Sequence, residues 1–348
     1  MSNVNTVLGK FAIKSIALVL LVKFLFVNFA QAQDIHYSQF YNPVLILNPA
    51  KTGIFNGDDR FLLSYRDQWS SVPVPWRTFT ASYDKKFYPS RSDNHFFSGG
   101  LSFNYDRQGD SNLSLSNLNL FGSYTKILNK RNLLTIGLGL GIASRAFDTE
   151  NLVWDSQWNG ATFDPGLPSL ERFDAERVNF LENTLGINYR WQKNKRTKFD
   201  LGLGVYHLLE PGVGFYDEED ITLPRRYNLS GIFSGKLTTR LDLQLQALGQ
   251  LQDEYNELLV GGLLKLYVNQ NRGKETELHV GIGYRTSGSF FPTAALQYKE
   301  RYYFSINFER DVSGFGQYTN GSAGFEAHFR YIIHKVKPLE QFKICPIY

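Results

Sequence analysis

The chain has 348 residues, of which 43% are hydrophobic and 15% aromatic, and its formal net charge is +4. Its single cysteine excludes an intrachain disulfide framework and a metal site built from several cysteines, and the nearly balanced charge argues against broad electrostatic binding of nucleic acid. Aromatic residues are abundant although the mean hydropathy is mildly polar. Apolar and polar residues must therefore be interleaved, which is typical of β-strands.

Residues 1–32 predict a cleaved signal peptide. Lys10 and Lys14 precede an apolar run over 16–29, and residues 30–32 have the small-x-small pattern of a signal-peptidase site. The run is shorter than the roughly 20 residues that cross a bilayer as a helix, which disfavours the alternative of an uncleaved anchor. Cleavage before Gln33 would leave an exported and almost neutral chain, because three lysines are removed with the peptide.

Alternating residues dominate the remainder of the chain. From Leu134 to Ile142 every second residue is a large aliphatic one, and the residues between them are mostly glycine. This period of two places the large side chains on one face of an extended strand. The same pattern recurs over 181–191, 241–248 and 278–285, with polar residues or glycine on the opposite face.

About fourteen such segments are present. They are 60–66, 76–85, 96–106, 114–127, 132–147, 178–191, 199–208, 226–236, 241–251, 256–268, 275–286, 290–299, 302–311 and 321–334. Most exceed the five or six residues usual for a soluble strand, and they reach the roughly 9 to 11 residues that a tilted strand needs to cross hydrocarbon. Only a closed barrel satisfies every backbone group there. We therefore predict an all-β fold, a transmembrane antiparallel β-barrel of about 14 strands with its apolar face toward lipid.

Aromatic residues and connection lengths indicate how such a barrel is oriented. Tyrosine and tryptophan near segment ends predict interfacial girdles, namely Trp76, Tyr124, Tyr189, Trp191, Tyr267 and Tyr298. With an even strand count, the two longest connections, 148–177 and 209–225, fall at the same end, opposite short basic turns. We expect the long connections outside the cell, the barrel in the outer membrane of a Gram-negative cell, and both termini in the periplasm.

Residues that could carry chemistry are sparse. The six histidines lack metal-ligand spacing, and no hydrolase, metalloprotease or nucleotide-binding motif is present. Gly137-x-Gly139-x-Gly141 lies inside an alternating strand, where glycine relieves crowding on the inner wall. The acidic residues 217–220 are interpreted as a solvated loop, not a cation site. No catalytic, cofactor-binding or metal-binding residues are predicted.

Motifs near both ends of the mature chain are more informative. Asn48-Pro49-Ala50-Lys51-Thr52-Gly53 is followed by Arg66-Asp67-Gln68-Trp69 and by Ser82-Tyr83-Asp84; near the C-terminus stand Glu309-Arg310-Asp311, the segment 324–331 and Lys343-Ile344-Cys345-Pro346-Ile347-Tyr348. In this order they resemble the PorP/SprF family of type IX secretion system membrane proteins. Phe325 and the Glu309-Arg310 pair depart from the family pattern of His and Ser-Tyr.

The resemblance implies a non-enzymatic outer-membrane component of the type IX secretion and gliding machinery of Bacteroidetes-type bacteria. Its expected partners are periplasmic ring and other components of that machinery, secreted adhesin-type cargo, and membrane lipid, but not nucleic acid. The chain then divides into a signal peptide (1–32), an irregular periplasmic or lumenal segment (33–59), the barrel (60–334) and a periplasmic tail (335–348). A general diffusion porin or uptake channel is the alternative function, and a soluble secreted β-protein is a third.

Candidate partner-contact residues follow from the motifs. They are Asn48, Pro49, Ala50, Gly53, Arg66, Gln68, Trp69, Asp84, Asp311, Glu326 and Cys345. For the N-terminal motifs, the sequence slightly favours a structural plug or turn framework over the alternative of direct partner contact. Cys345 follows the last predicted strand and could form an intermolecular disulfide in an oxidising periplasm, or remain a free thiol. Whether the lumen is open or plugged is not decided by the sequence.

Overall fold

The computed structural model describes residues 34–70, 75–89, 94–149, 152–216 and 221–335. The predicted signal peptide, the acidic residues 217–220 and Cys345 lie outside these residues. Helices long and apolar enough to cross a bilayer are absent from the described part of the chain.

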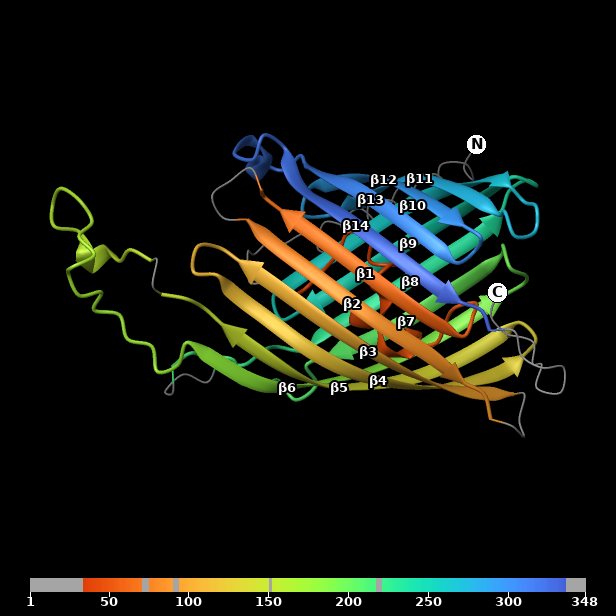
Figure 1. Cartoon of the computed structure of the whole chain (residues 1–348), viewed down its shortest axis with the longest axis horizontal. Coiled ribbons are helices and arrows are strands. Elements are labelled where there is room, and N and C mark those ends of the chain that lie inside the picture. The colour runs from red at the N-terminus through yellow and green to blue at the C-terminus, as the bar shows by residue number, and fades with distance from the viewer. Residues whose placement is uncertain (1–33, 71–74, 90–93, 150–151, 217–220, 336–348) are drawn as a thin grey trace, which may run out of the picture.

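The described residues form fourteen strands in one closed antiparallel barrel (Figure 1). The strands are β1 (Asp59–Gln68), β2 (Trp76–Phe87), β3 (His95–Gln108), β4 (Leu113–Asn129), β5 (Asn132–Ala146), β6 (Arg177–Gln192), β7 (Lys198–Tyr206), β8 (Arg226–Lys236), β9 (Leu241–Gln252), β10 (Tyr255–Asn269), β11 (Thr276–Arg285), β12 (Ser289–Tyr298), β13 (Tyr302–Asp311) and β14 (Ser322–Ile333). Each pairs with its sequence neighbours, and β1 closes the barrel against β14 in a register from Asp59 opposite Ile333 to Gln68 opposite Gly324. This confirms the predicted barrel, and the predicted strand bounds are within two residues of those observed.

The two faces of the wall have opposite polarity, as the alternation predicts. On β5, the side chain of Leu140 is 63% exposed on the outside, whereas that of Thr135 is 1% exposed on the inside. Large apolar residues cover the outer face along the other strands too, and the lumenal face carries many buried polar and charged residues. An apolar outside and a polar inside is the arrangement of a barrel that crosses a membrane.

The two ends of the barrel differ in their connections (Figure 1). One end, here called the long-loop end, carries the connections 147–176 and 207–225, the first of which contains the 3-10 turn η3 (Asp155–Gln157). The opposite end, here called the short-turn end, carries brief turns such as 130–131 and 299–301, and β14 also ends there. The two longest connections therefore lie at the same end of the barrel, as expected.

Two of the predicted girdle residues face the lumen. Tyr267 lies on the inner face of β10, where its hydroxyl donates a hydrogen bond to Asp242 at 2.7 Å. The alternation of β2 likewise places Trp76 on the lumenal side, edge-on against Trp69. The girdle prediction is wrong for both, because an aromatic residue at a strand end can lie on either face. Tyr124, Tyr189, Trp191 and Tyr298 have the outward alternation that a girdle requires.

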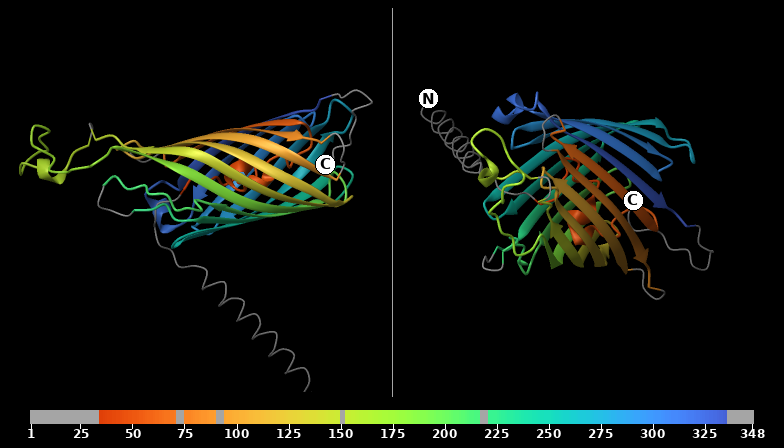
Figure 2. Two further views of the ribbon diagram at one scale, coloured as in Figure 1. Left: turned by 90° about the horizontal axis from the view of Figure 1, so that it is seen from below. Right: turned by 60° about the vertical axis from the view of Figure 1, so that its left-hand side comes forward.

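The segment before β1 lies inside the barrel (Figure 2). Residues 34–58, here called the lumenal plug, contain the 3-10 turns η1 (Val44–Ile46) and η2 (Pro49–Lys51). Asp34 contacts the long-loop ends of β7 and β8, whereas Lys335 pairs with Asp59 at the short-turn end. The first and last described residues thus lie toward opposite ends of the barrel. The segment from Asp34 to β1 runs through the lumen from the long-loop end to the short-turn end, and the side of the membrane on which each terminus lies stays a prediction.

Candidate functional site

Apolar residues on the lumenal wall meet apolar residues of the plug. Leu248, Leu259 and Phe291 of the wall surround Phe40 and Leu47 of the plug in one buried cluster. Two further clusters join Val44 and Leu45 to Leu62 and Phe121, and Ile54 to Phe96 and Leu133. Burying these side chains inside a polar lumen favours a docked plug, at about 25 cal/mol for each Å² of apolar surface removed from water.

Wall glycines make room for the η2 turn of the plug. A Cβ added to Gly137 would lie 2.5 Å from the carbonyl oxygen of Pro49, and one added to Gly204 would lie 2.5 Å from that of Leu47. Such approaches are closer than a side chain permits, so larger residues here would displace the plug backbone. The prediction that glycine relieves crowding on the inner wall is confirmed for Gly137, and the crowding comes from the plug.

Asn48 fixes this turn. Its side-chain oxygen accepts a hydrogen bond from the Ala50 amide at 2.8 Å, and its side-chain nitrogen donates to the Ile187 carbonyl of β6 at 3.0 Å. The first bond caps η2, where Pro49 occupies the first position. Asn48 and Ala50 are both fully buried. The first predicted motif therefore joins the plug to the wall.

Asp84 on β2 contacts another predicted motif residue, Gly53, and also Arg60 on β1. Its carboxylate accepts two hydrogen bonds from Arg60, at 2.8 and 2.7 Å, and one from the backbone amide of Gly53 at 2.7 Å. Gly53 has a φ of +75°, a conformation in which a side chain is strained. Arg60 also donates to the Lys51 carbonyl at 3.2 Å. Bidentate arginine and a buried amide together satisfy this carboxylate and fix the short-turn end of the plug.

Arg66 on β1 is the centre of a second ion network. It forms ion pairs with Glu309 on β13 at 2.9 Å and Glu326 on β14 at 3.2 Å, and it donates to the His36 carbonyl at 2.8 Å. Its side chain is 1% exposed. Arg285 on β11 pairs with the same Glu309 at 2.9 Å. The network therefore bridges the seam where the barrel closes.

The plug backbone completes this network. The amides of Ser38 and Gln39 donate to the two oxygens of Glu326 at 2.6 and 3.0 Å. The Ser38 hydroxyl donates to Glu309 at 3.0 Å. Since charge-assisted hydrogen bonds are the stronger class, Glu326 and Glu309 anchor the plug near its N-terminal end.

Asp34 provides a third anchor toward the long-loop end. Its carboxylate lies 2.7 Å from His207 and 2.9 Å from Arg226. Burial acts to raise the pKa of Asp34, but the Arg226 and His207 charges outweigh it and hold that pKa well below its usual range. Arg226 also donates to the Ile35 and Ile46 carbonyls at 3.0 and 3.2 Å. The plug is thus tied to the wall over its whole length.

The remaining predicted candidates lie at the barrel rim. Gln68 ends β1, and Trp69 follows it with a φ of +53° and donates its amide to the Ala323 carbonyl at 3.3 Å. Asp311 ends β13 and accepts a hydrogen bond from the Ser313 amide at 2.7 Å. None of these three joins the networks around Asp84 and Arg66.

Several residues that hold the plug were not predicted. They are Arg60, His207, Arg226, Arg285 and Glu309. The signal available was their position on the lumenal face of an alternating strand, where a charge needs a partner.

Ser64, His328 and Glu326 form an arrangement that resembles a hydrolase triad. His328 lies 2.8 Å from the Ser64 hydroxyl and 3.3 Å from Glu326. All three are at most 3% exposed, and Tyr37 of the plug packs edge-on against His328 at 5.5 Å. While the plug is docked, a substrate has no path to the hydroxyl. In the described part of the chain, no group of three acidic, histidine or cysteine residues is placed to hold a metal ion.

The long-loop end carries an aromatic and apolar lobe that projects from the barrel (Figure 1). Phe147 packs edge-on against Phe173 at 4.8 Å and against Phe215 at 4.6 Å, which ties the two long connections together. Beyond this cluster, Val153 and Leu170 are 61% and 78% exposed. Exposed apolar side chains on a loop mark a surface suited to protein contact.

Comparison with solved structures gives several transport barrels as similar chains. The Ralstonia pickettii toluene transporter TbuX has a TM-score of 0.48 and 11% identity, covering 84% of this chain and 93% of that one. A Pseudomonas aeruginosa FadL homologue has a TM-score of 0.48 and 13% identity, with 82% and 93% covered, and the Pseudomonas putida toluene transporter TodX has 0.46 and 11%, with 83% and 91% covered. At these identities and TM-scores the likeness supports no conclusion about this chain.

Family comparison is more specific. No curated protein matches the chain at a significant level. The model of the type IX secretion system membrane protein PorP/SprF matches residues 29–331, which include the plug and thirteen complete strands. The chain therefore belongs to the type IX secretion system membrane protein family PorP/SprF.

Proposed function

We propose that this chain serves type IX secretion as a plugged outer-membrane barrel that docks other proteins and does not conduct solutes. The observation that supports this most directly is the lumenal plug. Its anchors come from strands all round the wall, including β1, β2, β8, β13 and β14. A diffusion channel needs a continuous water-filled path, and a filled lumen opposes one.

The long-loop end is the surface for exported cargo in this proposal. Binding residues concentrate on loops that a rigid scaffold positions, and the lobe combines a packed aromatic base with exposed apolar side chains. With this end outside the cell, the lobe would hold large adhesin-type proteins at the surface. The short-turn end and the tail after β14 would then face the periplasmic components of the machinery.

Single-channel recording tests the plugged state. Purified protein in a planar bilayer is expected to stay nearly silent, whereas a variant lacking residues 34–58 is expected to conduct. Large, steady conductance of the unmodified chain would instead support the alternative of a diffusion porin or uptake channel.

A surface-anchoring assay tests the lobe. Val153→Ser, Leu170→Ser and Leu209→Ser change exposed apolar side chains of the two long connections. We expect cargo to be lost from the cell surface in this variant while the barrel still migrates as a folded, heat-modifiable band. Glu171→Ser with Arg172→Ser, at exposed polar positions of the same connection, is the matched control and is expected to retain cargo. Equal retention by both variants would contradict the assigned role.

A further inference from the structure

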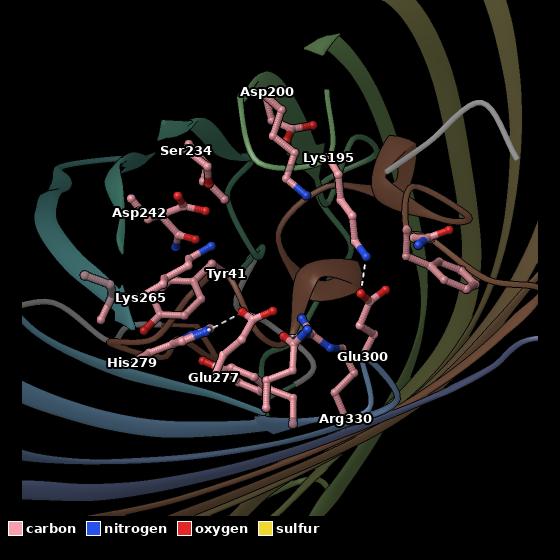
Figure 3. A pocket seen from close by; sticks show the side chains of 18 of the residues that line it. Tyr41, Lys195, Asp200, Ser234, Asp242, Lys265, Glu277, His279, Glu300 and Arg330 are labelled. Carbon is pink, nitrogen blue, oxygen red and sulfur yellow. Dashed lines mark hydrogen bonds and ion pairs between the residues drawn. The ribbon is translucent and has the colours of Figure 1, made fainter. Parts of the chain in front are cut away.

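A cavity of about 240 Å³ lies between the plug and the wall at the short-turn end. Residues of the plug, including Lys51 and Phe55, form one side, and lumenal side chains of the wall strands form the other. Lys195 and Glu300, from two short turns, line its mouth. We call this space the vestibule (Figure 3).

The vestibule has an excess of positive charge. Among the described residues that line it, eight are lysine or arginine and four are aspartate or glutamate. Each of the four carboxylates already has a partner, because Arg190, Arg196 and Lys195 pair with three of them and His279 contacts the fourth at 3.1 Å. Arg60 pairs with Asp84, which lies outside the lining, so the lining carboxylates do not balance Lys51, Lys265 and Arg330.

Three cations form no ion pair with any carboxylate of the described chain. They are Lys51 on the plug, Lys265 on β10 and Arg330 on β14. Arg330 lies over the Tyr303 ring at 4.4 Å and donates to Gln297 at 3.1 Å, but its Nε is buried with no hydrogen-bond partner among the described residues. Figure 3 shows Lys265 and Arg330 directed from opposite sides toward the same space. The Glu277 charge acts on both cations, but one carboxylate that also contacts His279 does not balance two buried cations. A further anion between them would relieve the remaining cost.

The charge state of Lys51 agrees with this arrangement. Its side chain is 6% exposed. Burial lowers the pKa of Lys51 to about 8; the Asp200 charge opposes this fall, and the Arg190 and Arg60 charges add to it. A nearby anion would raise that pKa and favour the charged lysine.

We propose that the vestibule binds the carboxylate side chains of an acidic protein segment that enters from the short-turn end. Arginine and lysine are the side chains that recognise carboxylates, and the apolar surface of Phe55 and Leu263 suits the methylene groups of glutamate. The barrel wall separates the vestibule from lipid, so a peptide reaches it more readily than a lipid headgroup does. The inference deepens the proposed function and rests on it only in taking the short-turn end to face the other secretion components.

The test is binding of hexaglutamate to the purified full-length chain in detergent, measured by calorimetry at low salt. Hexaglutamate is expected to bind, whereas hexaglutamine is not. Lys51→Gln combined with Lys265→Gln is expected to weaken binding by about tenfold or more, because each removes a charge-assisted contact. Lys130→Gln combined with Lys274→Gln removes two exposed lysines from turns at the same end and is the matched control, with an expected change below about twofold. Heat-modifiable migration on gels checks that each variant is folded. If the double variant is not folded, Lys265→Gln alone replaces it and is expected to weaken binding several-fold.

Three results would overturn the proposal. Absence of hexaglutamate binding would show that the vestibule takes no acidic peptide. An equal loss in the control pair would indicate diffuse surface attraction. Inorganic phosphate that competes at equal concentration would indicate a site for small anions. The binding assay includes no secretion step, so these three results bear on the vestibule alone. The proposed function is contradicted by different results, namely a conducting barrel or normal cargo anchoring after the lobe is changed.

Discussion

Replacement of Arg66 by methionine should release the N-terminal half of the plug and leave the barrel closed. Arg66 is 1% exposed and joins Glu309, Glu326 and the His36 carbonyl. Methionine keeps much of the side-chain volume but removes the charge and the donors. The strand ladders of β1 with β2 and β14 are made by backbone groups, so the substitution leaves them intact.

The size of the expected increase in released plug depends on which contacts the substitution removes and which remain. Glu309 keeps Arg285 and Ser38, and Glu326 keeps the amides of Ser38 and Gln39. Of the contacts that Arg66 makes, the hydrogen bond to the His36 carbonyl is the one that joins the wall to the plug, and a hydrogen bond to a charged group contributes about 1.5 to 3 kcal/mol. With every 1.4 kcal/mol worth a factor of ten, the released population should rise roughly 10-fold or more.

Thiol labelling measures this population. The chain has one cysteine, so Cys345→Ser removes it and Ile35→Cys then places a single thiol in the plug. Ile35 is 9% exposed, and because its side chain is apolar the substitution removes no hydrogen bond. The labelling rate with a bulky maleimide should increase in Arg66→Met. Arg77→Met is the matched control, because Arg77 is 58% exposed and its pair with Asp67 spans 3.4 Å on a neighbouring strand.

Two results would refute the reasoning. Protection of the thiol in Arg66→Met equal to that in Arg77→Met would mean that the ion network does not hold the plug. A variant that no longer migrates as a folded barrel would mean that the network holds the wall itself.

Three further predictions concern the glycine contact, Lys51 and Asp34. Gly137→Val places a side chain against the plug backbone and should increase the rate of the same thiol labelling. Gly249→Val is the control, because a Cβ added there has no atom within 4 Å, and it should leave the rate unchanged. Equal labelling rates in the two variants would contradict the steric argument. Burial lowers the pKa of Lys51 to about 8 in the docked plug, below the 10.5 of a free lysine. The released plug therefore binds the Lys51 proton more tightly than the docked plug does. The free energy of docking should accordingly become more favourable by up to about 3 kcal/mol from pH 7 to pH 10. Lys51→Met should flatten the rise of the thermal unfolding midpoint over that range, and an unchanged slope would assign the rise to another group. The pKa of Asp34 is lowered by Arg226 and His207 against the effect of burial, so this anchor is intact above about pH 4 and lost as the pH falls below it. Channel openings should therefore be more frequent at pH 3 than at pH 6, and Asp34→Asn should show them at both; a silent variant at pH 6 would count against this anchor.

The barrel was predictable because the membrane imposes its rules on each strand separately. Every strand needs about ten residues and an apolar outer face, so the alternation from Leu134 to Ile142 is sufficient to place β5 without knowledge of its neighbours. The positions of Trp76 and Tyr267 were not predictable in this way. A tyrosine or tryptophan at a strand end satisfies either an interfacial girdle or a lumenal hydrogen bond, and the choice depends on the partner across the lumen.

The plug contacts depend on residues far apart in the sequence. Arg66 meets Glu309 across 243 positions, and alternation shows only that each faces inward. Leu248 and Phe291 were a usable signal, because apolar residues on a lumenal face otherwise lined by glutamine and threonine require an apolar partner inside the barrel. The N-terminal motifs pointed to the right segment, but not to its path through the lumen.

The position of the Arg66 network has a consequence for the order of assembly. Arg66 belongs to the first strand, whereas Glu309 and Glu326 belong to the last two, and residues 36–39 contact members of both groups. Arg66 therefore finds its counterions only when the final hairpin arrives. Glu326 of that hairpin finds its backbone donors only when residues 38 and 39 already lie inside the curved sheet. Closure of the seam and capture of the preceding segment are thus coupled into one event, and a chain that closes empty leaves Glu326 without the two amides that neutralise it.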